Sequence, residues 1–480
     1  MKNTISLKKI CGCTLAVFIL LGIVFYAIAH QQLCYKVNTT DSLTPANNVG
    51  ELVAGDVVEQ SFSTEDDTLS RISLFFQTYG RTNVGTVTVS ILKENQILYE
   101  TVVDVATLQD NTYVTLPVNL EEISGKALTL RLTSANGVPG NAVTLAYGDS
   151  MNAGKIDVSV SNMQPAMKNG QSVAGALCMT MTTVESLWFG QYYWYFFAAT
   201  SMLLALYLVH LLRCSKLGKR SMGLSFLDAM TRYRFLLRQL VNRDFKTRYK
   251  RSVLGIFWSF LNPLLTMLVQ YLVFSTLFKS DIPNYPVYLL AGIVCFSYFS
   301  EAVNQCMVSI TGNASLITKV YVPKYIYPVS KALSSGINLL LSLIPLFVVI
   351  LITGLGIHTS ILLLPFGLIC LFMFCLGMGM LLATSMVFFR DTQFLWGVVS
   401  MLWMYCTPIF YPESIIPAKL MTFFKMNPLY HIIRFVRIVL IDGVSPEPKA
   451  YLFCIIACVV PLLLGLWAFK KNQDKFILHV

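Results

Sequence analysis

Long apolar segments separated by short polar ones occupy most of the chain, and they predict membrane-spanning helices. Crossing the hydrocarbon core of a bilayer takes about 20 consecutive apolar residues in a helix. Eight segments meet or approach this length: 10–29, 192–212, 257–278, 287–308, 328–355, 360–388, 394–411 and 451–469. The sequence therefore predicts a polytopic α-helical membrane protein with about eight transmembrane helices.

A polar block interrupts this pattern between the first two spans. Within residues 68–147, apolar side chains alternate with polar ones, as they do from Val87 to Ile91 and from Leu128 to Leu132. Alternation with period two places one face of a strand on a core and leaves the other in water. Turn signals such as Asn136-Gly137 separate the runs. We therefore predict an inserted all-β sandwich domain over residues 30–187.

The first apolar segment is interpreted as an uncleaved transmembrane anchor, residues 1–29. Its apolar run is long for a signal peptide, and the residues from Cys34 to Lys36 make a poor small-residue cleavage site. The second transmembrane helix, residues 188–213, is predicted to return the chain across the membrane.

The composition agrees with a chain that lies mostly in lipid. Of the 480 residues, 55% are hydrophobic and 13% are charged, whereas about 25% of residues in soluble domains are charged. The net charge of +11 does not indicate nucleic-acid binding, because the basic residues flank apolar segments, as in loops that face anionic lipid. Residues 30–187 hold 8 basic and 16 acidic residues, so the predicted sandwich is acidic.

The positions of lysine and arginine predict the side of the membrane on which each segment lies. Three precede the first span, twelve lie within residues 213–251, three within 311–331, and three follow residue 469. Both termini are therefore predicted to be cytoplasmic and the sandwich extracytoplasmic. Residues 412–449 are an exception, since they carry five basic residues on the predicted outer side.

The basic segment over residues 214–256 has a helical period. Phe226, Met230, Tyr233 and Leu237 recur at intervals of three and four, with basic residues between them. This pattern predicts an amphipathic helix at the inner membrane surface. Its cationic side suits lipid phosphates, and equally the anionic headgroup of a lipid-linked substrate. The candidates for this contact are Arg238, Arg243, Lys246, Arg248, Lys250 and Arg251.

The cysteines show no metal-ligand spacing. Ten of the twelve lie in or beside apolar segments, where a cysteine acts as a small apolar side chain. Cys34 and Cys178 flank the acidic block, so a disulfide between them is one interpretation and two free thiols is the other. The block has no Ser/His/Asp set, which favours a binding or spacer module, and carbohydrate binding is suggested only by analogy of fold.

Several stretches in the second half of the chain occur in the order found in a known family. They are RDFKTRYKRSVLGIFWSFLNPLL (243–265), NASLITKVYVPKYIYPVS (313–330), FFRDTQ (388–393), TPIFYPESIIPAKL (407–420) and NPLYHIIRFVR (427–437). From about residue 237 onward the chain resembles the ABC-2 type permeases that export polysaccharides such as O-antigen and teichoic acid. The resemblance implies a six-helix permease core over residues 257–480. The anchor and the sandwich lie outside the family pattern.

The resemblance also implies how the core is driven. In the family, the cytoplasmic loop between the second and third core spans carries a coupling helix that docks a separate ATPase. Its apolar and basic residues suit such a contact, although packing beneath the chain's own spans is the alternative. The candidates are Asn313, Leu316, Ile317, Lys319, Val320, Tyr321, Pro323 and Lys324.

In the family, two short helices after the fifth core span dip back from the outer face. Prolines break helices in this segment. Aromatic rings suit stacking on sugars and arginines suit anionic groups, whereas interfacial belts and lipid headgroups are the alternatives. Glu301 lies inside a span and is expected to pair with a basic residue or to contact substrate. The channel or gate candidates are Tyr271, Tyr298, Glu301, Trp403, Tyr405, Pro408, Tyr411, Pro412, Arg434 and Arg437.

The sequence has no G-x-x-x-x-G-K-[ST] motif, the loop that holds nucleotide phosphates. We therefore predict a permease subunit that is not an enzyme and has no cofactor of its own, with ATP and Mg²⁺ used by two copies of a partner ATPase. The resemblance implies a homodimer in the bacterial cytoplasmic membrane and a lipid-linked glycan as substrate. The alternatives are an exporter of a drug or small glycolipid, and a membrane receptor with an outer ligand-binding sandwich.

Overall fold

The computed structural model describes residues 2–40, 42–148, 161–219, 221–250, 254–278, 282, 284–319 and 322–479. The chain divides into a helical unit, Met1–Gln32 with Tyr192–Val480, and a β unit, Leu33–Gln191. Each unit has its own apolar core.

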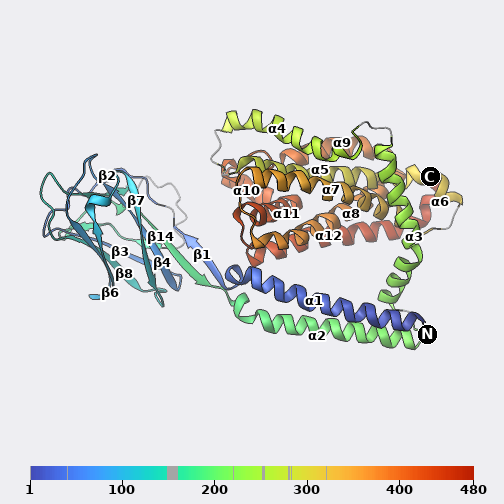
Figure 1. Ribbon diagram of the computed structural model, residues 1–480, viewed down its shortest axis with the longest axis horizontal. Coiled ribbons are helices and arrows are strands. Elements are labelled where there is room, and N and C mark those ends of the chain that lie inside the picture. Colours follow the sequence, from blue (N-terminus) through green and yellow to red (C-terminus); the bar gives the residue numbers. More distant parts are fainter. Residues whose placement is uncertain are drawn as a thin grey trace. The chain divides into compact units, whose positions relative to one another are not determined.

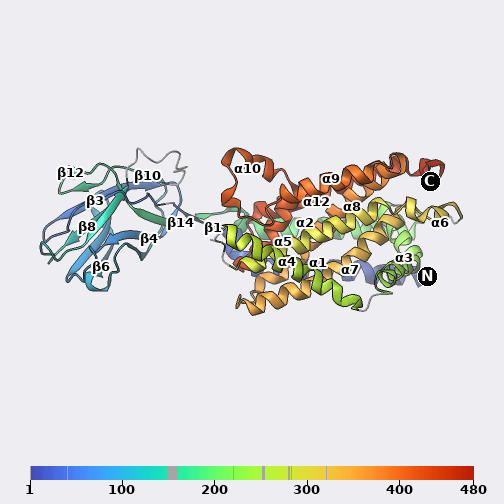
Figure 2. The same cartoon turned by 90° about the horizontal axis from the view of Figure 1, so that it is seen from above.

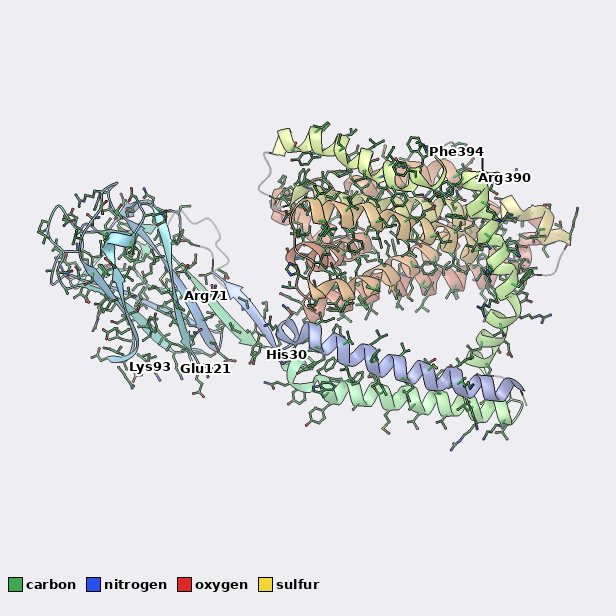
Figure 3. The ribbon with its side chains drawn as sticks, in the orientation of Figure 1. His30, Arg71, Lys93, Glu121, Arg390 and Phe394 are labelled. Atoms are coloured by element: carbon green, nitrogen blue, oxygen red, sulfur yellow. The ribbon has the colours of Figure 1, made fainter. Side chains whose placement is uncertain are left out.

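The β unit is a sandwich of two antiparallel sheets, which confirms the predicted all-β fold. One sheet has the order β1–β14–β4–β9–β13, with β7 on β4 and β2 on β9, and the other has the order β12–β11–β3–β8–β5–β6, with β10 on β3. Arg71 on β4 is labelled in Figure 3, where the side chains of this unit are drawn. The strands are β1 Tyr35–Thr39, β2 Asn47–Asn48, β3 Val57–Thr64, β4 Thr68–Gln77, β5 Thr86–Lys93, β6 Gln96–Asp104, β7 Thr112–Leu120, β8 Ala127–Ser134, β9 Thr144–Gly148, β10 Ser161–Met163, β11 Met167–Lys168, β12 Gln171–Ser172, β13 Ala176–Leu177 and β14 Met179–Ser186.

The alternation of the sequence produces the core of this unit. On β8, Leu128, Leu130 and Leu132 are fully buried, while the residues between them are half-buried. Phe62 and Phe76 from the two sheets pack in the same cluster. Burying one such side chain contributes about 1.5–3 kcal/mol to folding, so the register that places these residues inward is strongly favoured.

The suggested disulfide between Cys34 and Cys178 is wrong, because both thiols are free. Tyr35 on β1 pairs with Ser186 on β14, and the Cys34 carbonyl accepts a hydrogen bond from the Leu187 amide. Cys178 precedes the opposite end of β14, roughly 30 Å away at about 3.3 Å per residue. A disulfide requires Cα atoms about 4.4–6.8 Å apart. Burial raises the pKa of the Cys178 thiol to about 11, so this thiol stays protonated.

Three carboxylates of the β unit have pKa values below their ordinary range. In each case one hydrogen bond lowers the pKa most. The donor is the Gly140 amide for Glu51, the Asn169 side chain for Asp56 and the Thr78 amide for Asp110. A carboxylate whose pKa is lower in the folded state than in the unfolded state stabilises the fold at pH values above its unfolded-state pKa of about 4. This stabilisation is lost as the pH falls through the folded-state pKa.

We therefore expect the β unit to lose stability as the pH falls from about 5 to about 2. The measurement is hydrogen exchange of the full chain, comparing amide protection factors of β-unit peptides at pH 5.5 and pH 3. Asp56→Asn is expected to reduce the difference, since it removes one of the three titrating groups. Equal protection at both pH values in the unmodified chain would contradict the stabilising role given to these three carboxylates.

The helical unit contains both the predicted spans and several shorter helices. Figure 1 shows α1 and α2 running side by side as an antiparallel pair, and Tyr193 Oη donates to the Gly22 carbonyl at 2.8 Å across this pair. The helices are α1 Lys2–Cys34, α2 Trp188–Lys216, α3 Met222–Tyr249, α4 Trp258–Phe278, α5 Tyr285–Met307, α6 Ala314–Lys319, α7 Ile326–Ile352, α8 Leu364–Phe388, α9 Thr392–Tyr405, α10 Ala418–Lys425, α11 Pro428–Arg437, α12 Pro448–Asn472 and α13 Phe476–His479.

Seven helices in the described part of the chain are long and apolar enough to cross a membrane, rather than the predicted eight. The exception is the segment 394–411, which forms α9. This helix has 14 residues, a length of about 21 Å at 1.5 Å per residue, against a hydrocarbon thickness of about 30 Å. The helix ends at Tyr405, and Pro408 and Pro412, which lack an amide hydrogen, follow it closely.

Helices α5 and α8 are the most buried spans of the unit. Helix α5 is covered on most of its surface by α4, α7, α8 and α11. Helices α8 and α12 approach at two glycines, because a Cβ on Gly465 would lie 2.2 Å from the Gly377 carbonyl oxygen. Small residues allow this close backbone contact between membrane helices.

Candidate functional site

Helix α3 is held on the core through its apolar side. Ser221 caps its start, with Oγ accepting a hydrogen bond from the Leu224 amide at 3.3 Å. Tyr233, Leu237 and Leu240 pack in a cluster with residues of α6, α7, α8, α12 and α13. The apolar positions that the sequence predicted therefore form the side of α3 that packs on the other helices.

Three polar contacts fix the second half of α3. Lys331 Nζ on α7 lies 3.0 Å from Asp244 Oδ2, and both side chains are at most 18% exposed. Arg248 forms an ion pair with Glu301 on α5 at 2.7 Å. These contacts bind α3 to two spans. Arg243 Nη2 also donates to Asn313 Oδ1 at 3.3 Å, which joins α3 to the loop predicted to dock the ATPase.

Glu301 is thus paired with a basic residue, one of the two roles expected for it. Its Oε1 also accepts a hydrogen bond from Asn338 Nδ2 at 3.0 Å, and Tyr249 Oη donates to Asn338 Oδ1 at 3.0 Å. Sequence reasoning did not identify Asn338, although an asparagine inside a predicted span was a signal for an internal polar contact.

A cationic cavity of about 520 Å³ lies along the other side of α3. It is lined by Arg243, Phe245, Lys246, Thr247, Tyr249, Lys250 and Ile256. Lys246 and Lys250 are exposed and four residues apart, so they share one face of the helix. Neither forms an ion pair with a residue that the structure describes. Arg238 is exposed on the same helix, and Arg251 lies outside the described residues.

The predicted coupling loop forms a 3-10 turn, Thr311–Asn313, followed by α6. Ile317 is buried in the same apolar cluster as Leu240 of α3, and Leu316 packs against it, so Ile317 does not supply an exposed apolar contact. Lys319 is exposed at the end of α6. Asn313 is buried, and its Nδ2 donates to the Ser309 carbonyl at 2.7 Å.

The rest of this loop returns toward α7. Lys324 Nζ donates to the Gln473 carbonyl and lies over the Phe476 ring, so it is bound to the end of the chain. Pro323 is half-buried between α6 and α7. The candidates Val320 and Tyr321 lie outside the described residues.

Two short helices, α10 and α11, follow the predicted fifth core segment. Asn427 connects them to α9: its Oδ1 accepts hydrogen bonds from the Leu429 amide at 3.0 Å and from Trp403 Nε1 at 2.8 Å. Its Nδ2 donates to Thr407 Oγ1 at 2.8 Å. Sequence reasoning did not single out Asn427, but an asparagine followed by proline is a helix-start signal.

Arg437 on α11 is a structural residue rather than a substrate contact. Its side chain is buried, and the guanidinium donates to the carbonyls of Pro408 at 2.7 Å, Ile409 at 3.0 Å and Tyr288 at 3.2 Å. It also lies 3.4 Å from the centre of the Tyr288 ring. Gly292 leaves space for it, since a Cβ there would lie 2.7 Å from Nη2.

Arg434 keeps more freedom than Arg437. Its side chain is 52% exposed and lies 3.8 Å from Glu413 Oε1, while Nη1 donates to Tyr430 Oη at 3.3 Å. The two arginines were predicted to share one face and one role. The structure places them in different surroundings, so only Arg434 remains a candidate for contact with an anionic group.

The aromatic candidates also divide into buried and exposed residues. Tyr298 is buried, and its hydroxyl is 3.4 Å from the Ala332 carbonyl. Trp403 packs against Phe299 and Phe374. Tyr271 and Tyr405 are exposed, and Tyr411 Oη donates to the Tyr405 carbonyl at 2.7 Å.

Comparison with known proteins identifies the helical unit. Residues 236–441, from α3 to the turn after α11, match the family model described as ABC-2 type transporter. The chain is 30% identical over 242 residues to the O-antigen export system permease protein RfbA of Klebsiella pneumoniae, a match that covers 50% of this chain and 93% of that protein. The chain belongs to the ABC-2 type transporter family.

Other proteins named for polysaccharide export match similar shares of the chain. The O-antigen export system permease protein RfbA of Myxococcus xanthus is 30% identical over 246 residues, covering 51% of this chain and 95% of that protein. The capsule polysaccharide export inner-membrane protein CtrC of Neisseria meningitidis is 24% identical over 211 residues, covering 43% and 79%. Together with the seven apolar helices, the family makes this chain a multi-pass membrane protein.

Proposed function

We propose that this chain is the transmembrane subunit of an ATP-driven exporter that moves a lipid-linked polysaccharide out of the cytoplasm. The observation that carries the proposal is its similarity, over 79% to 95% of their length, to membrane proteins named for O-antigen and capsule polysaccharide export. The β unit lies outside the matched residues, so its role does not follow from these relatives.

The energy for transport is proposed to come from two copies of a separate cytoplasmic ATPase. The turn and helix over Thr311–Lys319 support this part, because α6 exposes Ser315, Thr318 and Lys319 while Ile317 anchors it to the core. Arg243 joins the same loop to α3, so a displacement of the loop is transmitted to α3. This docking requires the loop to lie on the cytoplasmic side, in agreement with the distribution of basic residues.

The chain is proposed to work as a homodimer. Helix α9 supports this assembly, since it is too short to cross the hydrocarbon alone and its large apolar side chains are uncovered. Figure 3 labels Phe394 on this helix, with Arg390 just before it. Phe394, Leu395 and Val398 are between 66% and 76% exposed.

The cationic cavity on α3 is proposed to receive the anionic headgroup of the lipid-linked glycan. Lys246 and Lys250 supply free positive charges at its rim, and Phe245 and Ile256 supply apolar surface for the lipid. A phosphate is recognised by such charge-assisted contacts. Lys246→Gln with Lys250→Gln is expected to reduce export severalfold, and Lys→Arg at both positions is the matched control.

The function is tested by removing the chain from its host. We expect lipid-linked glycan to accumulate inside the cells and surface polymer to fall, as measured by mass spectrometry of the lipid extract and by surface labelling. Reintroducing the unmodified chain is expected to restore both. Normal surface polymer with no intracellular accumulation in the depleted cells would overturn the assignment of substrate.

A further inference from the structure

A second cavity lies between α4, α5 and α7, three helices that lie side by side in both views (Figure 1 and Figure 2). Its volume is about 360 Å³. Each helix contributes a pair of polar residues four positions apart, which places them on one face of that helix, and α4 adds Ser259. The paired residues are Asn262 and Thr266 on α4, Ser297 and Glu301 on α5, and Asn338 and Ser342 on α7.

Such a concentration of polar groups requires a reason, because these helices are long and apolar enough to span a membrane. A polar side chain at membrane depth faces a cavity or the protein interior and marks a pathway or a ligand. Asn262, Thr266 and Ser297 form no side-chain hydrogen bond with any residue that the structure describes. One turn further along α4, Gln270 Oε1 is buried and also has no partner. The hydrogen-bond donors and acceptors along α4 therefore remain available to bind a ligand.

The charge of the cavity decides which ligand it suits. Among the residues that the structure describes, the charged ones lining this cavity are Arg248 and Glu301, and they neutralise each other at 2.7 Å. Bringing a phosphate or carboxylate into this site would require a free cation, since an unpaired charge is costly away from water. The free lysines lie in the other cavity, along α3. An uncharged ligand with many hydroxyl groups fits the amides and hydroxyls of this one.

We infer that the cavity between α4, α5 and α7 is a binding subsite for an uncharged sugar residue of the exported glycan. Asn262 and Ser297 bind sugar hydroxyls, and the half-exposed ring of Trp258 at the rim stacks on the apolar C–H face of the sugar. The volume falls within the usual range for small-molecule sites, about 300–1,000 Å³. The inference rests on the proposed function and assigns the phosphate and the sugar to adjacent cavities that meet at Tyr249.

The test uses the full chain in lipid nanodiscs and two photoreactive probes with the same alkyl chain. One probe has an uncharged disaccharide headgroup and the other a phosphate headgroup, and mass spectrometry locates the labelled peptides. We expect the disaccharide probe to label α4, α5 and α7, and Asn262→Leu to reduce that labelling about tenfold, the scale of losing a specific hydrogen bond in a pocket. The phosphate probe is expected to label α3 and to be unaffected.

Asn304→Leu is the matched control, because it makes the same substitution on α5 outside the residues that line the cavity. Ser297→Ala is a second variant with little steric change, expected to weaken labelling in the same direction. Size-exclusion profiles check that each variant is folded. Equal disaccharide labelling in Asn262→Leu, Ser297→Ala and Asn304→Leu would overturn the subsite, as would stronger labelling of the cavity by the phosphate probe.

Export in cells separates this inference from the function on which it rests. If removing the chain leaves surface polymer unchanged, the proposed function fails regardless of the labelling. If export requires the chain but Asn262→Leu alters neither export nor labelling, the sugar subsite alone fails.

Discussion

Replacing Arg437 with methionine is expected to destabilise the helical unit by about 3 kcal/mol, because three carbonyl groups lose a charged hydrogen-bond donor. The substitution preserves most of the apolar stem but removes the guanidinium that donates to the carbonyls of Pro408, Ile409 and Tyr288. The Pro408 carbonyl keeps a longer contact with Tyr288 Oη at 3.3 Å. Each buried acceptor left unpaired costs about 1–3 kcal/mol. The measurement is equilibrium unfolding of the purified chain in mixed detergent micelles.

Arg434→Met provides the matched control three residues earlier on the same helix. Its side chain is 52% exposed and its ion pair with Glu413 spans 3.8 Å, so we expect a loss below about 1 kcal/mol. Arg437→Lys is expected to fall between the two, because a single ammonium cannot reach three carbonyls in the geometry of a planar guanidinium. Equal losses for Arg434→Met and Arg437→Met would contradict the role given to Arg437.

Arg434 and Arg437 show which features the sequence predicts and which it does not. A spacing of three predicts that both residues lie near one face of α11, and the structure has a helix there. The pattern does not say which other elements reach that face. Pro408 and Ile409 come from the segment after α9 and Tyr288 from α5, so the surroundings of Arg437 depend on contacts distant in sequence.

The same limit applies to the other elements. The alternation from Leu128 to Leu132 predicted the buried face of β8, because a period of two reflects local geometry. The free thiols of Cys34 and Cys178 follow from the pairing of β1 with β14, which composition does not encode. For α9, counting apolar residues predicted a full span, whereas Pro408 and the hydrogen bonds of Asn427 turn the chain away after Tyr405.

Breaking the ion pair between Asp244 and Lys331 is expected to have the second large effect on stability. Asp244→Asn is expected to destabilise the chain by about 3 kcal/mol, because it leaves the nearly buried Lys331 ammonium without its counter-ion. Lys331→Met is expected to cost less, since Asp244 Oδ1 still lies 3.0 Å from Arg243 Nη2. The measurement is the midpoint of unfolding of each variant in the same detergent.

The double variant Asp244→Asn with Lys331→Met distinguishes this coupling from two independent losses. We expect it to be more stable than Asp244→Asn alone, because removing the lysine removes the uncompensated charge, and a double-mutant cycle isolates that term. The same pair fixes α3 to α7 beside the Arg243–Asn313 contact. ATP hydrolysis by the proposed partner ATPase should therefore become less dependent on substrate in Asp244→Asn and recover partly in the double variant. Strictly additive losses would show that the two residues do not act as a pair.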